Sequence, residues 1–141
     1  IPPEHCAVIG DSRFDLPLFH HAGLSIAFNA KDSVIQHAAD IAISSPDLRD
    51  VLPWLLAERV TRSDLSFTYP SAQQATTIVN AITPDNLALP EGLHIASWYH
   101  EQEVKIRVVT TKGLNTLLAT LDDLLLNIQI IEKTFPVLGA V

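Results

Sequence analysis

The sequence contains a single cysteine, no methionine and no long run of apolar residues. One cysteine, Cys6, excludes an internal disulfide and the paired spacing of zinc-binding cysteines, so we expect a reducing, cytoplasmic compartment. No apolar run approaches the roughly 20 residues that span a bilayer, and no signal peptide opens the chain, so we expect a soluble protein. The missing methionine and the start at Ile1-Pro2-Pro3 predict that the chain is a piece of a longer protein.

Basic residues are also scarce. The 141 residues include 9 Lys and Arg against 16 Asp and Glu, which gives a formal net charge of −7 at pH 7. Because binding to nucleic-acid phosphates depends on clustered Lys and Arg, this composition argues against tight nucleic-acid binding by the chain alone. Any role on RNA would be shared with partners. The hydrophobic content of 48% predicts a globular protein rather than a disordered one.

The first part of the sequence predicts strands that alternate with short helices. Strands are expected at residues 5–10, 24–28 and 40–44, the first of them buried on both faces. Ser12 and Asp15 have the spacing of a capping box at the start of a helix, and Gly23 is expected as its left-handed C-cap. Further helices are expected at residues 32–39 and 47–57. This alternation predicts parallel βα units, and we expect residues 1–57 to form a truncated, doubly wound α/β lobe.

The pattern changes after a boundary that we expect between Glu58 and Asp64. Leu65, Phe67 and Tyr69 alternate with polar residues, as in an antiparallel strand with one exposed face. A turn at Pro84-Asp85-Asn86 separates the next two elements. After the first strand, the elements are expected as a helix at 71–82, strands at 93–100 and 104–110, and a helix at 114–135. Residues 65–136 therefore predict a β-α-β-β-α module, with two helices on one face of a three-stranded antiparallel sheet.

The motif Gly10-Asp11-Ser12-Arg13-Phe14-Asp15 lies where the first strand ends and a helix begins. In doubly wound sheets, ligands bind beyond the carboxyl ends of the strands. Two carboxylates four residues apart on such a turn can both approach Mg²⁺, which proteins hold with one or two carboxylates, phosphate oxygens and water. Alternatively, Asp11 and Asp15 only cap the helix and favour its positive end. The hexapeptide alone leaves both interpretations open.

A longer stretch, AVIGDSRFDLPLFHHAGLSIAFNAKDSVIQHAADIAI, resembles the C-terminal part of haloacid-dehalogenase-type phosphatases, and among them the phosphoserine phosphatases. The resemblance covers about residues 5–56 and implies that Asp11 is a magnesium ligand and that Asp15 supports the metal shell. Phe14 stands where those phosphatases usually carry Asn. Their nucleophilic aspartate, in a D-x-D-x-T motif, has no counterpart here, and neither do the Ser or Thr and the Lys that contact the phosphoryl group. No catalytic residue is therefore predicted, and magnesium is expected only with the full phosphatase domain.

The second module resembles the small PCC-type subunit of KEOPS, of the CTAG/Pcc family, which acts in the formation of threonylcarbamoyladenosine in tRNA. The resemblance rests on the segments AITPDNLALPEGLHI and GLNTLLATLDDLLLNIQIIEKTF. It implies a homodimerising scaffold that docks on the KEOPS catalytic subunit and engages tRNA only as part of a complex. Two function classes stay open: such a scaffold fused to a phosphatase-like fragment, or a magnesium-dependent phosphomonoesterase whose nucleophile-bearing part is missing.

The last predicted helix carries two apolar strips. Ala119, Leu126 and Ile130 form the smaller strip, which we expect to bind a partner unless a loop or the first module covers it. Lys105 and Arg107 are expected on the outer face of their strand, as a small basic surface for RNA or as an ordinary solvated face. The broader strip is expected to be core and consists of Leu114, Leu117, Leu118, Leu121, Leu124, Leu125, Ile128 and Ile131.

Overall fold

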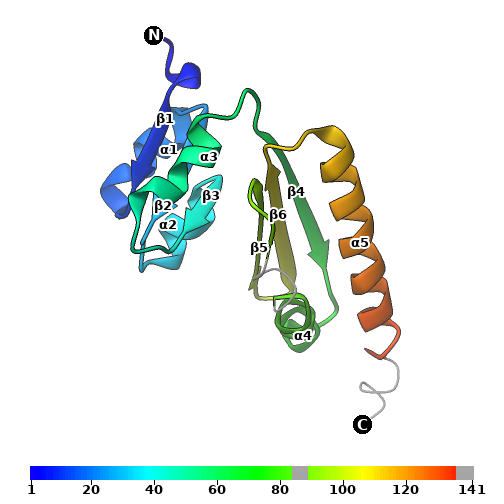
Figure 1. Ribbon diagram of the computed structural model, residues 1–141. Coiled ribbons are helices and arrows are strands. Elements are labelled where there is room, and N and C mark those ends of the chain that lie inside the picture. The colour runs from blue at the N-terminus through cyan, green and yellow to red at the C-terminus, as the bar shows by residue number, and fades with distance from the viewer. Residues whose placement is uncertain (84–88, 136–141) are drawn as a thin grey trace. The chain divides into compact units, whose positions relative to one another are not determined.

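The computed structural model describes residues 1–83 and 89–135 (Figure 1). The chain divides into two compact units, unit 1 at Ile1–Val60 and unit 2 at Thr61–Val141. The division falls inside the stretch from Glu58 to Asp64 in which we expect the boundary. The predicted turn at Pro84-Asp85-Asn86 lies outside the described residues.

Unit 1 is built on a three-stranded parallel sheet in the order β1-β2-β3. Its strands are β1 (Ala7–Gly10), β2 (Leu24–Phe28) and β3 (Ile41–Ile43), preceded by the short 3₁₀ helix η1 (Pro3–His5). The connections are helical and consist of η2 (Arg13–Asp15), α1 (Leu16–His21) and α2 (Ser33–Ala38). Parallel strands joined by helices confirm the α/β class predicted for the first module.

The core of unit 1 lies on the central strand β2, whose first four residues are all buried. Phe19 of α1 and Ile35 of α2 pack there with Ala27. Strand β1 was expected to be buried on both faces, and this prediction is wrong: its residues alternate between exposed and half-buried, and Ile9 is 40% exposed. The reason is its place in the sheet, because within the described residues β1 pairs only with β2.

Gly23 is not a left-handed helix cap, contrary to the prediction. Helix α1 ends at His21, and Ala22 follows in an extended conformation, while Gly23 does not have a positive φ. A Cβ atom on Gly23 would lie only 1.9 Å from the carbonyl oxygen of Glu4. The Gly23 N–H also donates to the Cys6 carbonyl at 3.0 Å. Glycine therefore stands here because two backbone segments approach each other closely.

The helix predicted at residues 47–57 is shorter and irregular. It consists of the 3₁₀ helix η3 (Leu48–Val51) followed by the four-residue α3 (Leu52–Leu55). Pro53 has no N–H with which to continue an α-helical ladder, and the Leu52 N–H bonds to the Arg49 carbonyl in the tighter 3₁₀ pattern. The Asp47 carboxylate caps the start by accepting the Arg49 N–H at 2.9 Å.

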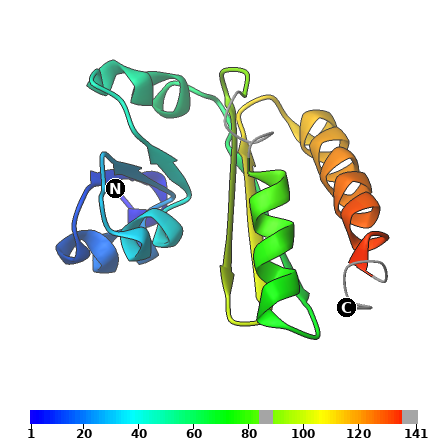
Figure 2. The ribbon, with the colours of Figure 1, turned by 90° about the horizontal axis from the view of Figure 1, so that it is seen from below.

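Unit 2 has the predicted order β-α-β-β-α. Its elements are β4 (Thr61–Thr68), α4 (Ala72–Ile82), β5 (Leu93–His100), β6 (Glu103–Thr110) and α5 (Leu114–Glu132). The strands form an antiparallel sheet in the order β4-β6-β5, and both helices lie on one face of it (Figure 2). This confirms the fold predicted for the second module. Strand β4 starts four residues before the predicted Leu65.

The core of unit 2 lies between the central strand β6 and the two helices. Val104, Ile106 and Val108 alternate along β6 and are almost completely buried. The Tyr69 hydroxyl donates to the Glu132 carboxylate at 2.8 Å, which ties the end of α5 to the segment after β4. The helix residues of this core are Ala75, Ile78, Val79 and Ile82 of α4 and Leu117, Leu124 and Ile128 of α5.

Candidate functional sites

Asp11 and Asp15 lie on the turn that follows β1. The Asp15 Oδ2 atom accepts the Asp11 N–H at 3.0 Å, the Ser12 N–H at 3.1 Å and the Ser12 hydroxyl at 3.3 Å. These hydrogen bonds hold the pKa of Asp15 below its ordinary value, and the bond from the Ser12 N–H has the largest effect. Asp15 therefore fixes the backbone of the turn that presents Asp11.

Gly10 is part of the same arrangement. A Cβ atom at this position would lie 2.4 Å from both Cγ and Oδ2 of Asp15, too close for any real contact. The Asp15 carboxylate thus occupies the space that a side chain at residue 10 would need. This interlock explains why residue 10 is glycine although its φ is not positive. The sequence motif alone did not reveal the interlock.

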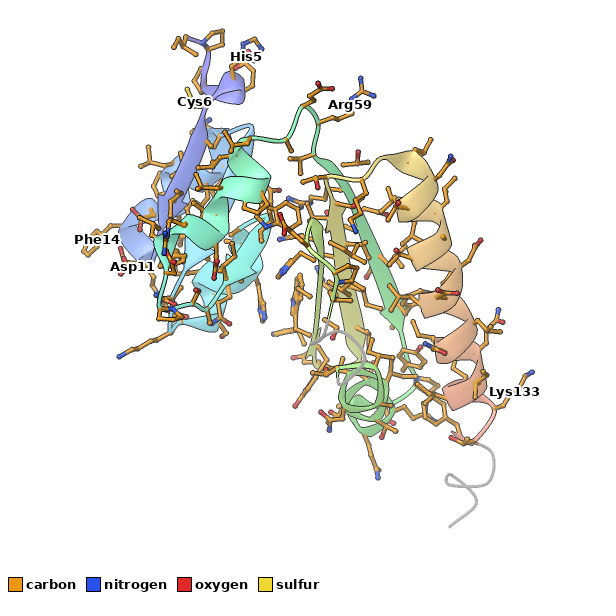
Figure 3. All side chains as sticks on the ribbon, in the orientation of Figure 1. His5, Cys6, Asp11, Phe14, Arg59 and Lys133 are labelled. Carbon is orange, nitrogen blue, oxygen red and sulfur yellow. The ribbon has the colours of Figure 1, made fainter. Side chains whose placement is uncertain are left out.

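The Asp11 carboxylate accepts no hydrogen bond from the part of the chain that the structure describes. It is exposed, and Phe14 on the same turn is 93% exposed (Figure 3). Within residues 1–83 and 89–135, no group of three or more His, Cys, Asp or Glu side chains could hold a metal ion. The residues fit part of a magnesium site, with Asp11 as a ligand and Asp15 as support for the turn. Their assignment as metal-site residues stays a prediction, because the hydrogen bonds of Asp15 are also those of a residue that caps the start of a helix.

The loops after β2 and β3 meet near this turn in the sheet topology, because the carboxyl ends of parallel strands lie at one edge. Asn29, with φ of 53°, donates its side-chain amide to the Ser45 carbonyl at 2.8 Å and accepts the Ser45 N–H at 2.9 Å. Arg13 pairs with Asp32 at 2.5 Å. Sequence reasoning missed both contacts, since they join residues 16 and 19 positions apart.

The strip predicted to bind a partner is exposed on α5. Leu126 is 57% and Ile130 is 54% exposed, and Ala119 is also exposed. The broader strip was expected to be core throughout, and this is wrong for three members, since Leu114, Leu118 and Leu125 are 61%, 50% and 37% exposed. A helix that packs on a sheet buries only a narrow row of its residues. The unpartnered apolar surface of α5 is therefore larger than predicted.

By helical spacing, the three exposed leucines fall on one flank of the buried row of α5. The opposite flank of the buried row, with Thr120 and Asn127, faces α4 and β5. Strand β4 contacts α5 and pairs only with β6 among the described residues, so its second edge is open. By length and composition alone, α5 is the one helix in the described part that could cross a membrane. In the structure it carries three residues of the unit 2 core.

Lys105 and Arg107 lie on the sheet face opposite the helices, and their charges are partly balanced. Arg107 Nε donates to Asp64 Oδ1 at 2.8 Å and its guanidinium lies 5.5 Å from the Trp98 ring centroid. Lys105 Nζ is 3.9 Å from Glu103. Burial raises the pKa of Asp64, but bonds from Arg62 and Arg107 outweigh it and lower that pKa overall. A basic surface for RNA at these residues stays a prediction.

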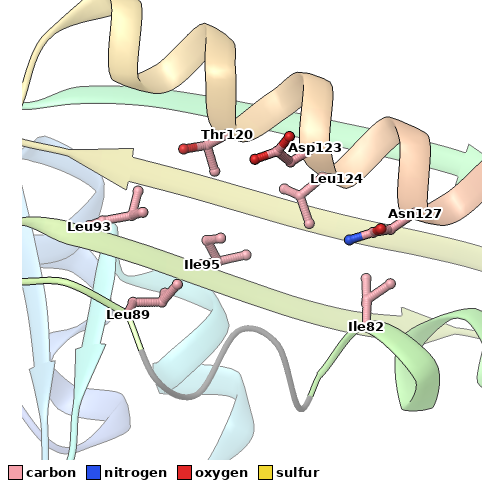
Figure 4. A pocket seen from close by; sticks show the side chains of 8 residues that line it. All are labelled: Ile82, Leu89, Leu93, Ile95, Thr120, Asp123, Leu124 and Asn127. Carbon is pink, nitrogen blue, oxygen red and sulfur yellow. The ribbon is translucent and has the colours of Figure 1, made fainter.

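A pocket of about 250 Å³ lies between α4, α5 and β5. Sequence reasoning did not find it, because its walls come from three elements far apart in the chain. The side chains that line it are Ile82, Leu89, Leu93, Ile95, Thr120, Asp123, Leu124 and Asn127 (Figure 4).

Known proteins are similar to each part of the chain. Residues 1–51 match the model of a family described as haloacid dehalogenase-like hydrolase. The phosphoserine phosphatases of Methanocaldococcus jannaschii and Albidiferax ferrireducens are each 40% identical over 52 residues, which is 37% of this chain and 24% and 22% of those proteins. The chain thus spans less than a quarter of the length of these curated relatives. The phosphatase resemblance of the first module is confirmed.

The crystal structure of the binary complex Gon7-Pcc1 contains a chain of similar fold. The TM-score is 0.50 at 15% identity, and the match covers 55% of this chain and 95% of that chain. Unit 1 is too short to contain a match over 55% of this chain, whereas unit 2 is long enough. At this identity the similarity shows the fold alone, and it confirms the fold resemblance of the second module.

Proposed function

We propose that unit 2 is a scaffold and dimerisation module of the PCC type, working in a cytoplasmic KEOPS complex that forms threonylcarbamoyladenosine in tRNA. The observation that carries the proposal is its β-α-β-β-α fold, which covers 95% of a chain in the Gon7-Pcc1 complex. The exposed apolar surface of α5 supports a binding role, because monomeric soluble proteins rarely leave a large continuous apolar patch uncovered.

Two features of unit 2 suit association with a second copy. Among the described residues the eight-residue strand β4 pairs only with β6, so its second edge offers backbone donors and acceptors at alternate residues. The exposed Leu114, Leu118 and Leu125 fall, by helical spacing, on the flank of α5 that faces away from α4 and β5. Since α5 also contacts β4, a second copy paired along β4 would cover them. Leu126 and Ile130 point farther from the sheet and are left for a different partner, the KEOPS catalytic subunit.

Engagement of tRNA is expected only within the complex. The chain has a net charge of −7, and the basic groups Arg107 and Lys105 lie near carboxylates. Counterion release by so few free cations is small. Other subunits would therefore supply most of the phosphate contacts.

A second candidate function rests on unit 1. Its 40% identity over 52 residues to two phosphoserine phosphatases favours a longer parent protein that is a magnesium-dependent phosphomonoesterase. In that protein Asp11 would ligate the metal, and magnesium would neutralise phosphoryl charge while an aspartate from outside these 141 residues attacks phosphorus. Unit 2 would then dimerise or regulate the enzyme.

The scaffold proposal is tested in a strain that lacks its PCC-type subunit. We expect the chain to restore threonylcarbamoyladenosine in tRNA, measured by mass spectrometry of nucleosides, and to co-purify with the catalytic subunit. An Asp11→Asn variant is the control and is expected to restore it equally well. Failure of the wild-type chain to restore the nucleoside while it still folds would overturn the proposal.

A further inference from the structure

The pocket between α4, α5 and β5 has an apolar floor and a polar rim on one side (Figure 4). Ile82 at its base is 2% exposed and Leu124 is 5% exposed, so the floor is part of the rigid core. Three residues of α5, at successive turns, supply the rim: Thr120, Asp123 and Asn127.

Two rim groups have unused hydrogen-bonding capacity. The Thr120 hydroxyl donates to the Thr116 carbonyl at 2.8 Å. The Asp123 carboxylate and the Asn127 amide, by contrast, bond to nothing in the part of the chain that the structure describes. Residues four apart on a helix share a face, and both side chains border the pocket on either side of Leu124. Within residues 1–83 and 89–135, the pocket therefore combines an apolar cavity with a carboxylate and an amide that have no hydrogen-bond partner.

Size and charge restrict the occupant. At about 250 Å³, the cavity is below the roughly 300–1,000 Å³ of typical sites for small molecules and cofactors. It suits one large apolar side chain. The free carboxylate and the net charge of −7 favour a cation beside that anchor and disfavour an acidic neighbour.

We propose that this pocket binds an apolar side chain of a partner protein, with a Lys or Arg of the same segment pairing with Asp123. The inference rests on the proposed scaffold function and names a second contact, separate from the β4 edge. The pocket lies on the flank of α5 opposite Leu114, Leu118 and Leu125. A dimer formed along β4 thus leaves it open, and one copy can hold both partners.

The test is an NMR titration of the full chain with short helical peptides. One peptide carries a Leu anchor and an Arg one turn away; the second has Glu for Arg, and the third has Ala for Leu. The signals observed are the methyl groups of Ile82, Ile95 and Leu124. We expect the Arg peptide to bind about threefold more tightly than the Glu peptide, as for a partly exposed ion pair, and the Ala peptide to lose about tenfold or more.

Two isosteric variants make the test specific. Asp123→Asn should abolish the preference for Arg over Glu, whereas Asp122→Asn, its exposed neighbour, should keep it. A preference that survives Asp123→Asn, or titration without any shift of the pocket methyls, overturns the inference. Restoration of threonylcarbamoyladenosine by the wild-type chain is scored separately. Its failure counts against the scaffold function, while success together with unmoved methyls counts against the pocket alone.

Discussion

At the scale of single residues, the turn after β1 shows how closely glycine and aspartate depend on each other. Gly10 and Asp15 were predicted as strand end and capping residue, and the structure places the Asp15 carboxylate in the space beside Gly10. Pattern reasoning identified the right residues because capping spacing is local. It could not show the interlock, which depends on the path of the backbone between them.

Replacing Gly10 with Ala should destabilise unit 1. The new Cβ would lie 2.4 Å from Asp15 Cγ, and such overpacking typically costs about 1–3 kcal/mol. Urea unfolding followed by Trp54 fluorescence, in a Trp98→Phe background, reports this unit alone. Asp15→Ala should relieve part of the cost, so that the effects of the two substitutions are not additive. Equal stability of Gly10→Ala and the parent would disprove the interlock.

Asp15 should also contribute a pH-dependent term to the stability of unit 1. Hydrogen bonds from Ser12 and Asp11 lower its pKa in the folded state below the ordinary 3.8. A depressed carboxyl pKa stabilises the fold above the unfolded value and loses that effect as pH falls below it. We expect unfolding curves of the parent and Asp15→Asn to differ at pH 6 and to converge towards pH 2. Asp11→Asn is the control, and a parent that keeps its advantage at low pH would contradict the prediction.

At the scale of elements, periodicity predicted unit 2 well. Strand β5 has the predicted bounds, and α4 begins after its predicted cap, Ser71, whose hydroxyl accepts the Gln74 N–H at 3.2 Å. The exposure of Leu114, Leu118 and Leu125 was not predicted, because an apolar stripe does not reveal how much of its width a neighbouring sheet covers. Similarly, the apolar run of β1 predicted a strand buried on both faces. Among the described residues, however, β1 is an edge strand that pairs only with β2.

The surface of α5 should matter more for association than for folding. Leu126→Lys with Ile130→Lys removes apolar surface that is more than half exposed, and burial of such surface between chains is worth about 25 cal/mol per Å². We expect this pair to weaken binding to the catalytic subunit, and Leu118→Lys with Leu125→Lys to weaken the dimer. Circular dichroism and light scattering separate folding from association.

The matched control for α5 is Asn115→Lys with Gln129→Lys, which adds the same charge at exposed polar positions. It should leave both interactions nearly unchanged. If the leucine variants unfold, the residues are part of the core after all. If they associate like the control, the helix surface plays no part in binding.

At the scale of the whole molecule, two sheets of different kinds lie in one chain. The parallel and antiparallel patterns were distinguishable because buried parallel strands are continuously apolar, whereas strands with one exposed face alternate. The two family resemblances rested on particular sequence segments and not on these patterns. The arrangement of the candidate metal site could not be predicted. The Asp15 Oδ2 atom accepts three hydrogen bonds within the turn, and residue spacing does not reveal such bonds.

The chain should bind divalent metal weakly and should not hydrolyse phosphate esters. Asp11 offers a carboxylate, but the described residues contain no group of three or more His, Cys, Asp or Glu side chains that could hold a metal ion. The 141 residues also include no D-x-D-x-T motif that could supply the nucleophile. Paramagnetic Mn²⁺ should broaden the amide signals of Gly10 and Ser12, and Asp11→Asn should abolish this effect. With magnesium and phosphoserine or an aryl phosphate, released phosphate should not exceed that of the Asp11→Asn control, because a metal without a nucleophile provides no covalent step. Turnover by the parent that disappears in Asp11→Asn would show that these residues form a working phosphatase site without the missing motif.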